Sequence, residues 1–450
     1  MNRLIGTHEA CRIGASIVLL TFCLTLQVNA EAPMPIEDAL KRAFSHNREY
    51  LSALEELNNA SARITEARAG AFPVLSFSGG YTRNWEPNEF VISMNGEAQH
   101  LRIGTDNTFS AGLRFTQPLY LGGKVGTALK IAKIYKNYSL QNLVTVYNKV
   151  RLDVYKSYYG LVLANEVVRV AEQAHILATA SREVVEKMAF QGVVSEYDLL
   201  RAKVAESNTI PAEIRAHSVA ATAGDALKSI LGMSLSDEIN ILSDCDFSNV
   251  DPILSQPVDY YRNLALENRS DLKGLDYLVQ IMDKNIKIQK SAYLPSLIFA
   301  TDLAWQAQRD DWNVEPDNWN RSISSSLLLE VPIFEGFGRS AKVKQARIEK
   351  YQIHLSYEQL RDVVELEVKS TYGDLKESFE RLGSQEQTVE MAKEGLRISE
   401  LRYKNGVGTH LEVIDARTAL VQAEINLVNA RHDLIISLAA FDKAIGTVKP

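Results

Sequence analysis

The chain has 450 residues, and its 56 acidic against 49 basic side chains give a formal net charge of −7. This acidic balance argues against a nucleic-acid partner. Beyond the amino-terminal segment no stretch holds eighteen uninterrupted apolar residues, so the sequence predicts no membrane-spanning helix.

The amino terminus has the pattern of a secretory signal. Arg3 and Arg12 give a positive start, residues 13–28 form an apolar run, and the small residues VNA at 28–30 form a cleavage site. The run is too short for a membrane span. We therefore expect residues 1–30 to be a signal peptide that directs export.

The cysteines support no internal cross-link. Cys11 and Cys23 leave with the signal, and Cys245 alone remains in a mature chain that starts at about Glu31. We therefore expect no intrachain disulfide. A lipid anchor on Cys23 is disfavoured, because Phe22 stands where a lipoprotein signal needs a small residue.

The sequence repeats itself over a long period. Three pairs of segments match in order, residues 70–77 with 292–299, 116–122 with 330–336, and 191–202 with 405–416. The first pair is 222 positions apart and the other two are 214 apart. This period far exceeds that of solenoid repeats. It predicts two similar units, residues 31–256 and 257–450.

Two long proline-free stretches predict very long helices. No proline occurs at residues 119–210 or 333–449, and proline breaks helix interiors. Apolar residues recur every seven positions in both stretches, which predicts coiled-coil packing along helices of roughly 65–70 residues, on the order of 100 Å. The recurring residues are Leu140, Tyr147, Val154, Leu161 and Val168, with a companion seam of Leu143, Val150, Ala164 and Ala171, and in the second half Val368, Leu375, Leu382, Val389, Leu396 and Tyr403.

Four short segments alternate apolar and polar residues and predict two β-hairpins, at about residues 73–118 and 295–332. Their length and alternation are typical of outer-membrane barrel strands, although a small soluble sheet packed on helices stays open. Polar links at residues 84–107 and 308–318 predict exposed loops. The apolar positions are Leu75, Phe77, Tyr81, Phe109, Ala111, Leu113, Phe115, Leu297, Phe299, Leu303, Trp305, Ile323, Leu327 and Leu329, with Trp85, Trp312 and Trp319 near the outer ends.

Four strands cannot close a barrel by themselves. An open edge in lipid leaves backbone groups without partners, and closed barrels start near eight strands. The strands must therefore be pooled between chains. Eight strands leave no water-filled lumen, whereas twelve do, so polar inward faces favour three chains. The predicted fold class is mainly α with a small β component, built from a duplicated helix–strand–strand–helix–helix unit.

This order of elements resembles the TolC-like outer-membrane efflux protein family. The motifs that carry the resemblance are AFPVLSF and YLPSLIF, QPLYLGG and VPIFEGFGR, and YKNGVGTHLEVIDARTAL at residues 403–420. The resemblance implies a homotrimer, with a twelve-stranded barrel in outer-membrane lipid continued by a long periplasmic α-helical barrel. It also implies a passive export channel that docks to a periplasmic adaptor and works with an inner-membrane pump or ABC exporter, in tripartite efflux or type I secretion.

The alternative is a soluble periplasmic coiled-coil scaffold without channel activity. A periplasmic enzyme has no supporting residues. The glycine-rich GFGRSA at residues 336–341 lacks the βαβ context of a dinucleotide site, and the histidines show no metal spacing. We therefore expect no catalytic residue, cofactor or metal. His410 at the tip is either a pH-sensing residue or, as we expect, an exposed turn residue.

Two turns, at about residues 191–195 and 405–409, join the long helices to their return helices. Each has a glycine to end one helix and a hydroxyl, Ser195 or Thr409, to cap the next. Local features alone describe ordinary helix hairpins. The resemblance makes these turns the adaptor-binding tip, formed by Gly192, Val193, Ser195, Leu199, Gly406, Val407, Thr409 and Val413.

Charged and polar residues near the turns suggest an entrance. Glu412 and Asp415 lie three apart on one helix face, which is either a solvated face or, under threefold symmetry, two acidic rings that favour cations. The resemblance matches both to entrance carboxylates. It also matches Asp198 and Tyr403 to a contact that closes the channel. The family's additional arginine falls at Gly408.

Overall fold

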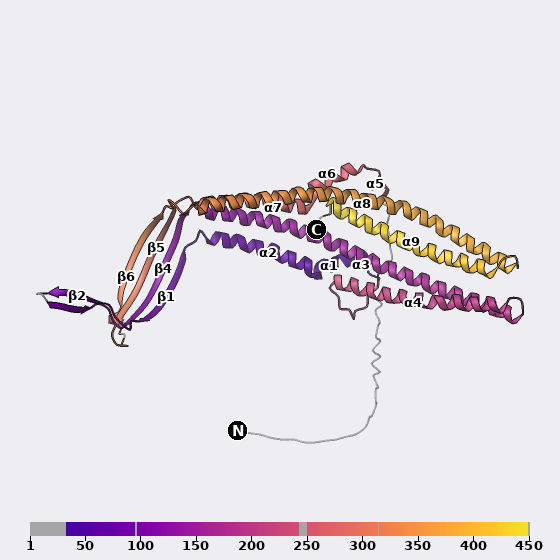
Figure 1. Cartoon of the computed structure of the whole chain (residues 1–450), viewed down its shortest axis with the longest axis horizontal. Helices are drawn as coiled ribbons and strands as arrows, with labels where there is room; N and C mark the ends of the chain where they lie inside the picture. The colour runs from indigo at the N-terminus through magenta and orange to yellow at the C-terminus, as the bar shows by residue number, and fades with distance from the viewer. Residues whose placement is uncertain (1–32, 95–96, 243–249, 314, 449–450) are drawn as a thin grey trace, which may run out of the picture.

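The computed structural model describes residues 33–94, 97–242, 250–313 and 315–448. The predicted signal peptide, Cys23 and Cys245 lie outside these ranges. A sheet occupies one end of an elongated molecule, and two long helices run from it to turns at the far end, from which two shorter helices return to the middle (Figure 1).

Four antiparallel strands form one sheet in the order β1 (Val74–Arg83), β4 (Asn107–Leu121), β5 (Ser296–Arg309) and β6 (Asn320–Glu330). The predicted hairpins are confirmed, and β4–β5 pairing joins them. The register aligns the apolar positions of every strand. A row of apolar residues therefore crosses the sheet on one face, formed by Phe77, Leu113, Leu303 and Ile323.

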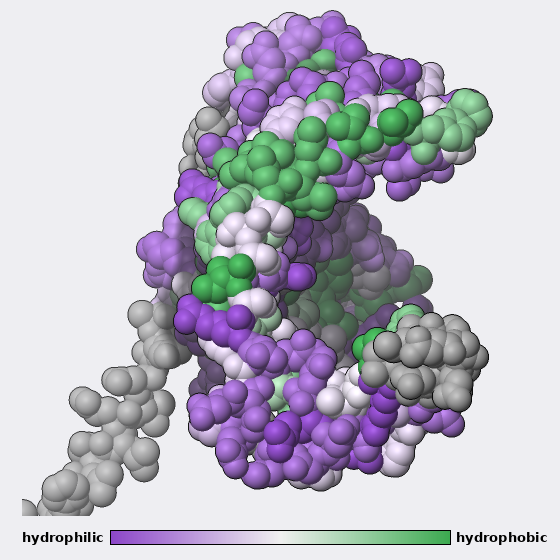
Figure 2. Space-filling model, turned by 90° about the vertical axis from the view of Figure 1, so that its left-hand side faces the viewer, coloured by the Kyte–Doolittle hydropathy of each residue, from purple (hydrophilic) through white to green (hydrophobic). Residues whose placement is uncertain are grey.

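The apolar face of the sheet is bare. Phe77 is 71% exposed, and Leu327 and Leu329 are exposed as well. The strands stand apart from the helices (Figure 1), and apolar residues form a band in the view onto this end (Figure 2). Within the described residues the sheet is not packed on helices, so that alternative does not fit.

The first link between strands differs from its prediction as a loop. Residues 84–107 include a second hairpin, β2 (Glu89–Met94) with β3 (Glu97–Arg102). The sequence EFVISM contains β-branched and aromatic residues, which favour strands, and this signal outweighs the polar surroundings. The second link contains only a single 3₁₀ turn, Pro316–Asn318.

Nine helices within the described residues form two similar sets. They are α1 (Ile36–His46), α2 (Arg48–Ala69), α3 (Lys124–Phe190), α4 (Glu196–Ile230), α5 (Val250–Leu254), α6 (Val258–Asn268), α7 (Ser270–Ser291), α8 (Gly338–Lys404) and α9 (His410–Ile445). Helices α3 and α8 each have 67 residues and begin 214 positions apart, at 124 and 338. Helices α2 and α7 begin 222 positions apart, at 48 and 270.

The predicted heptad stripe of the second half is confirmed. Val368, Leu375, Leu382, Val389 and Leu396 are all buried, on the side of α8 that packs along α9. The first stripe is only partly right, because Leu140 is 44% exposed. This part of α3 packs between α2 and α7, so a single two-helix seam does not describe it.

The core lies in the middle part of the molecule, which we call the waist. There one cluster of buried residues joins α3 to α1, α4 and α9, and a second joins α8 to α5, α6, α7 and α9. In each half, a tyrosine on the long helix holds a connecting segment of the chain through a hydrogen bond. The hydroxyl of Tyr158 lies 2.7 Å from the Met34 carbonyl oxygen and 2.8 Å from that of Leu242. Tyr372, 214 positions later, donates in the same way to the carbonyl of Gln256 at 3.0 Å.

Candidate functional site at the helical tips

Both tip turns are built as the sequence predicts. Gly192 and Gly406 have φ of 74° and 71°, the left-handed conformation that ends helices at low cost in glycine. Ser195 accepts a hydrogen bond from the Asp198 amide at 3.2 Å, and Thr409 accepts one from the Glu412 amide at 3.3 Å. The two predicted caps are therefore confirmed.

The residues predicted to contact an adaptor differ in exposure. Val193 and Val407, beside the two glycines, are both exposed, as are Ser195 and Thr409, whereas Leu199 is half-buried. Val413 is 4% exposed, because it faces the inside of the hairpins. In this conformation Val413 is therefore covered, whereas the valines beside the glycines and the two cap residues are accessible.

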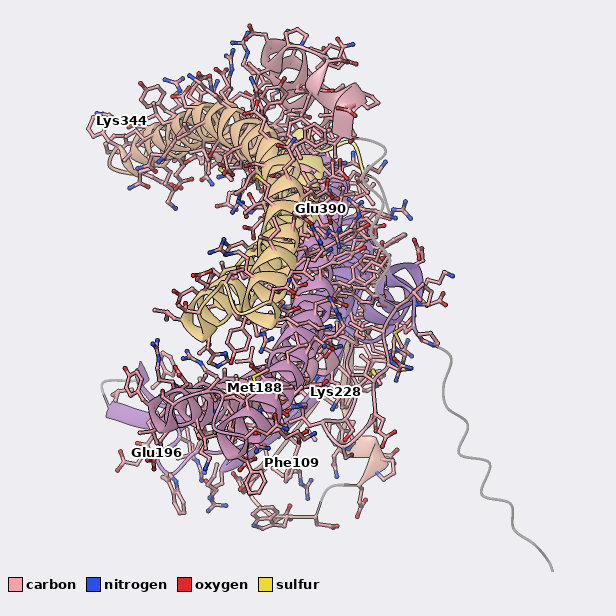
Figure 3. The ribbon with its side chains drawn as sticks, turned by 90° about the vertical axis from the view of Figure 1, so that its right-hand side faces the viewer. Phe109, Met188, Glu196, Lys228, Lys344 and Glu390 are labelled. Carbon is pink, nitrogen blue, oxygen red and sulfur yellow. The ribbon has the colours of Figure 1, made fainter. Side chains whose placement is uncertain are left out.

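Tyr403 lies between the two hairpins. Its hydroxyl donates to Sδ of Met188 at 3.7 Å, a residue near the end of α3 that Figure 3 labels. The Asp198 carboxylate accepts from the Ser195 hydroxyl at 2.7 Å. Burial and the charge of Asp198 raise the pKa of Tyr403. Asp198 and Tyr403 are neighbours, but each bonds to another residue here.

The two predicted entrance carboxylates have different surroundings. Glu412 forms an ion pair with Arg402 at 3.2 Å and belongs to the Thr409 cap. Asp415 is exposed and has no ion pair with any residue that the structure describes. A ring of Asp415 would therefore carry uncompensated charge, whereas the charge of Glu412 is largely offset.

The turn is shaped around Gly408. A Cβ atom at this position would lie 2.9 Å from Cβ of Arg402 and 3.1 Å from the Tyr403 nitrogen. Real Cβ atoms essentially never approach so closely, so a larger residue requires the turn to move. The position where the resemblance places an arginine cannot hold one in this conformation.

His410 is the functional candidate that the sequence missed. It was expected to be exposed, but it is only 6% exposed. Neither ring nitrogen has a hydrogen-bond partner among the described residues. Its ring lies 5.3 Å from that of Tyr403. Burial lowers the pKa of His410, Asp198 opposes this, and Arg417 and Arg201 lower it further. Its position, one residue after a cap, signalled only a turn.

No group of three or more histidine, cysteine or acidic residues in the described ranges could hold a metal ion. None of the helices in the same ranges combines the length and apolar character needed to cross a membrane. The apolar surface of the described sheet, in contrast, is uncovered.

A sheet with a bare apolar face, joined to two helices about 100 Å long that end in helical hairpins, is typical of outer-membrane channels with a helical extension. The chain belongs to the outer membrane efflux protein family, whose model matches residues 39–233 and 261–447. It is an export channel of the outer membrane that extends into the periplasm.

Known relatives cover nearly the whole chain. The outer membrane protein TolC of Vibrio cholerae is 22% identical over 420 residues, which are 92% of this chain and 91% of the relative. The solvent efflux pump outer membrane protein SrpC of Pseudomonas putida is 22% identical over 90% of this chain and 84% of the relative. The crystal structure of the Campylobacter jejuni CmeC outer membrane channel superimposes with a TM-score of 0.72 at 18% identity, covering 91% and 85%.

Proposed function

We propose that three copies of this chain form one channel, the passive exit duct of a tripartite efflux pump. The observation that carries this proposal is the four-stranded sheet, in which β1 and β6 are edges without partners. Such edges are not tolerated in lipid. Three sheets joined edge to edge give twelve strands, enough to surround a water-filled lumen.

The long helices also need neighbours. On α8 several large apolar side chains are exposed, namely Ile348, Tyr351, Leu355, Val363 and Leu366. They lie on the part of α8 between the sheet and the waist. Helix α9 does not cover them, because it packs along the part of α8 between the waist and the tip. A surface of this kind is typical of a contact with another subunit. In a trimer, α8 of one copy would pack against a neighbouring copy, and the helices would close into a periplasmic tunnel.

We further propose that the two halves, residues 31–256 and 257–450, are the duplicated units, and that the exposed tips dock to a periplasmic adaptor. The name of the solvent efflux relative supports efflux over type I secretion. The choice depends on the partner, an inner-membrane pump for efflux or an ABC exporter for secretion.

Channel formation can be tested on the mature protein purified in detergent. We expect a trimer by native mass spectrometry and ion conductance across a planar lipid bilayer. Leu366→Glu should weaken the trimer, because Leu366 is 68% exposed in one chain and would be buried between chains. Lys376→Glu, an exposed change on the same helix, is the control. A monomeric wild-type protein that conducts no ions would refute the proposal.

The tip is proposed to be a gate held partly by Tyr403. Removing its hydroxyl in Tyr403→Phe takes away the bond to Met188 and the possible bond to Asp198. Because hydrogen bonds of this kind contribute about 1 kcal/mol, we expect more frequent openings in single-channel recordings. Conductance and open time equal to those of the wild type would count against the gate.

A further inference from the structure

A groove of about 740 Å³ runs between the two hairpins above the tip turns. Helices α3, α4 and α9 line it. Its walls carry small and apolar side chains, among them Ala171, Ala174, Ala178, Val204, Val421 and Ile425. The volume lies in the range of small-molecule sites, which are mostly apolar with a few polar groups.

Three nitrogen-bearing side chains line this groove with unused hydrogen-bonding capacity. Both ring nitrogens of His410 are without partners among the described residues, as is Nε of Arg417. The other nitrogens of Arg417 donate to the Leu177 carbonyl oxygen at 2.9 Å and to Glu400 at 3.1 Å. The guanidinium of Arg201 lies 5.8 Å from the centre of the Tyr197 ring and has no ion pair within the same residues.

Buried polar nitrogens without partners are uncommon in folded proteins and cost stability. A ligand with acceptor oxygens would accept from Nε of Arg417 and from the protonated ring nitrogen of His410, and from both ring nitrogens once the imidazole is protonated. The guanidinium of Arg201, which has no ion pair among the described residues, favours a negatively charged head, and the alanine-rich walls favour an unbranched apolar tail. We propose that this groove is a binding site for a single-chain amphiphilic anion, with its head among Arg201, His410 and Arg417 and its tail along α3 and α9.

The α8 contact proposed above lies apart from this groove. The exposed apolar residues of α8 lie outside the groove, which α8 does not line. This proposal is tested by measuring anion binding, which is independent of the measurement of ion conductance. A channel that conducts but binds no anion would refute this site alone, and a protein that binds the anion but conducts no ions would refute only the channel.

The site should respond to pH. Burial and the two arginines lower the pKa of His410, which favours its neutral imidazole. The other groups facing it are Asp198 on α4, held by its bond to Ser195, and Tyr403 on α8; the groove wall on α3 carries no charged side chain. A bound anion favours the protonated imidazole. Binding therefore tightens as the pH falls.

The experiment uses the full mature protein in an amphipathic polymer and octyl sulfate as the probe, since its head stays ionised at all pH values used. Isothermal titration calorimetry at pH 7.5 should show saturable binding, and none of comparable affinity for octanol or octyltrimethylammonium. Arg201→Gln should raise Kd about tenfold, as expected for the loss of a charge-assisted hydrogen bond. Arg215→Gln is the control, because Arg215 is exposed on the same helix and outside the groove.

A second variant tests His410. Wild-type affinity should rise several-fold between pH 7.5 and 6, and His410→Leu should abolish this rise while the circular dichroism and the oligomeric state stay unchanged. Equal binding of octyltrimethylammonium, or an unchanged Kd in Arg201→Gln, would overturn the proposal. So would the absence of binding to the wild type, which would assign the groove to another occupant such as a helix of a partner protein.

Discussion

Phe337 stands where the chain turns from the last strand segment into α8. Its φ is 66°, and it is the one residue other than glycine with a positive φ among the described residues. The first half has Gly123 with φ of 76° at the position 214 residues earlier. A side chain in this left-handed conformation costs roughly 1–2 kcal/mol. The exposed Phe337 ring packs edge-on against Phe334 at 5.5 Å, which offsets part of this cost.

This strain can be measured with two substitutions that both remove the ring. Phe337→Gly should be about 1 kcal/mol more stable than Phe337→Ala, because only glycine relieves the backbone. Gly123→Ala provides the matched control. A Cβ atom there would meet no atom within 4 Å, so its cost of about 1 kcal/mol would come from φ alone. Urea unfolding in detergent gives the three values, and equal stability of the two Phe337 variants would exclude the strain.

At this scale the sequence predicts backbone features better than side-chain environments. Ser195 and Thr409 were predicted as caps because a cap needs only a hydroxyl and a turn. The burial of His410 was not predictable, because it depends on the opposite hairpin, which is more than 200 positions away along the chain. The different charge environments of Glu412 and Asp415 were not predictable either, because only the folded turn brings Arg402 to Glu412.

Among the helices, a buried charge cluster at the waist connects α7, α8 and α9. Arg269, the residue that precedes α7, is buried. It bonds to Asp271 at 2.7 Å, to Glu367 on α8 and to the Ala444 carbonyl oxygen on α9. Burial raises the pKa of Glu367, but Arg269 and Lys443 outweigh this effect and lower it, so the carboxylate stays ionised.

Removing one partner of this cluster should be costly. Arg269→Met leaves the half-buried Glu367 with a single cation, Lys443 at 3.2 Å, and should lower the free energy of unfolding by up to about 3 kcal/mol, the low end of the range for a buried pair. The double variant Arg269→Met with Glu367→Met should recover much of that loss. Denaturant unfolding measures both. A double variant as unstable as the single one would show that packing of Arg269, and not its charge, holds the waist.

At the equivalent place in the first half, an uncharged residue connects the helices. Asn47 stands 222 positions before Arg269 and precedes α2, where its side chain accepts from the amides of Glu49 and Tyr50 and donates to the Ile230 carbonyl oxygen at 3.2 Å. The repeat therefore predicts the helix bounds of both halves but not their contacts. The second heptad stripe was predictable because α8 pairs with one helix along its lower part, whereas α3 packs against several.

For the whole channel, the tips should set ion selectivity through Asp415. In planar bilayers Asp415→Asn should lower the ratio of cation to anion permeability by roughly twofold or more, because three uncompensated charges leave the entrance. Glu412→Gln should change the ratio less, since Arg402 already offsets that charge. Larger effects from Glu412 than from Asp415 would mean that the turn opens in the conducting state.

The sequence predicts much of the whole-molecule architecture, because alternation and heptads are properties of each element on its own. The strands show this most clearly, since Phe77, Leu113 and Leu303 fall on one face as expected. The β2–β3 hairpin was missed because its short apolar alternation lies among polar residues. The proposed number of chains depends on how the sheet edges pair and how the barrel closes. These are properties of the assembly, and no single element of the sequence encodes them.

Helices α3 and α8 have the same number of residues, 67 each, which constrains how such a protein can change its reach. One heptad added to both arms of a single hairpin would lengthen it by about 10 Å and leave alternate tips at different heights. A partner that seats on all the tips would then meet only half of them. Growth or shortening of the channel therefore requires matched insertions or deletions in all four arms of the two hairpins.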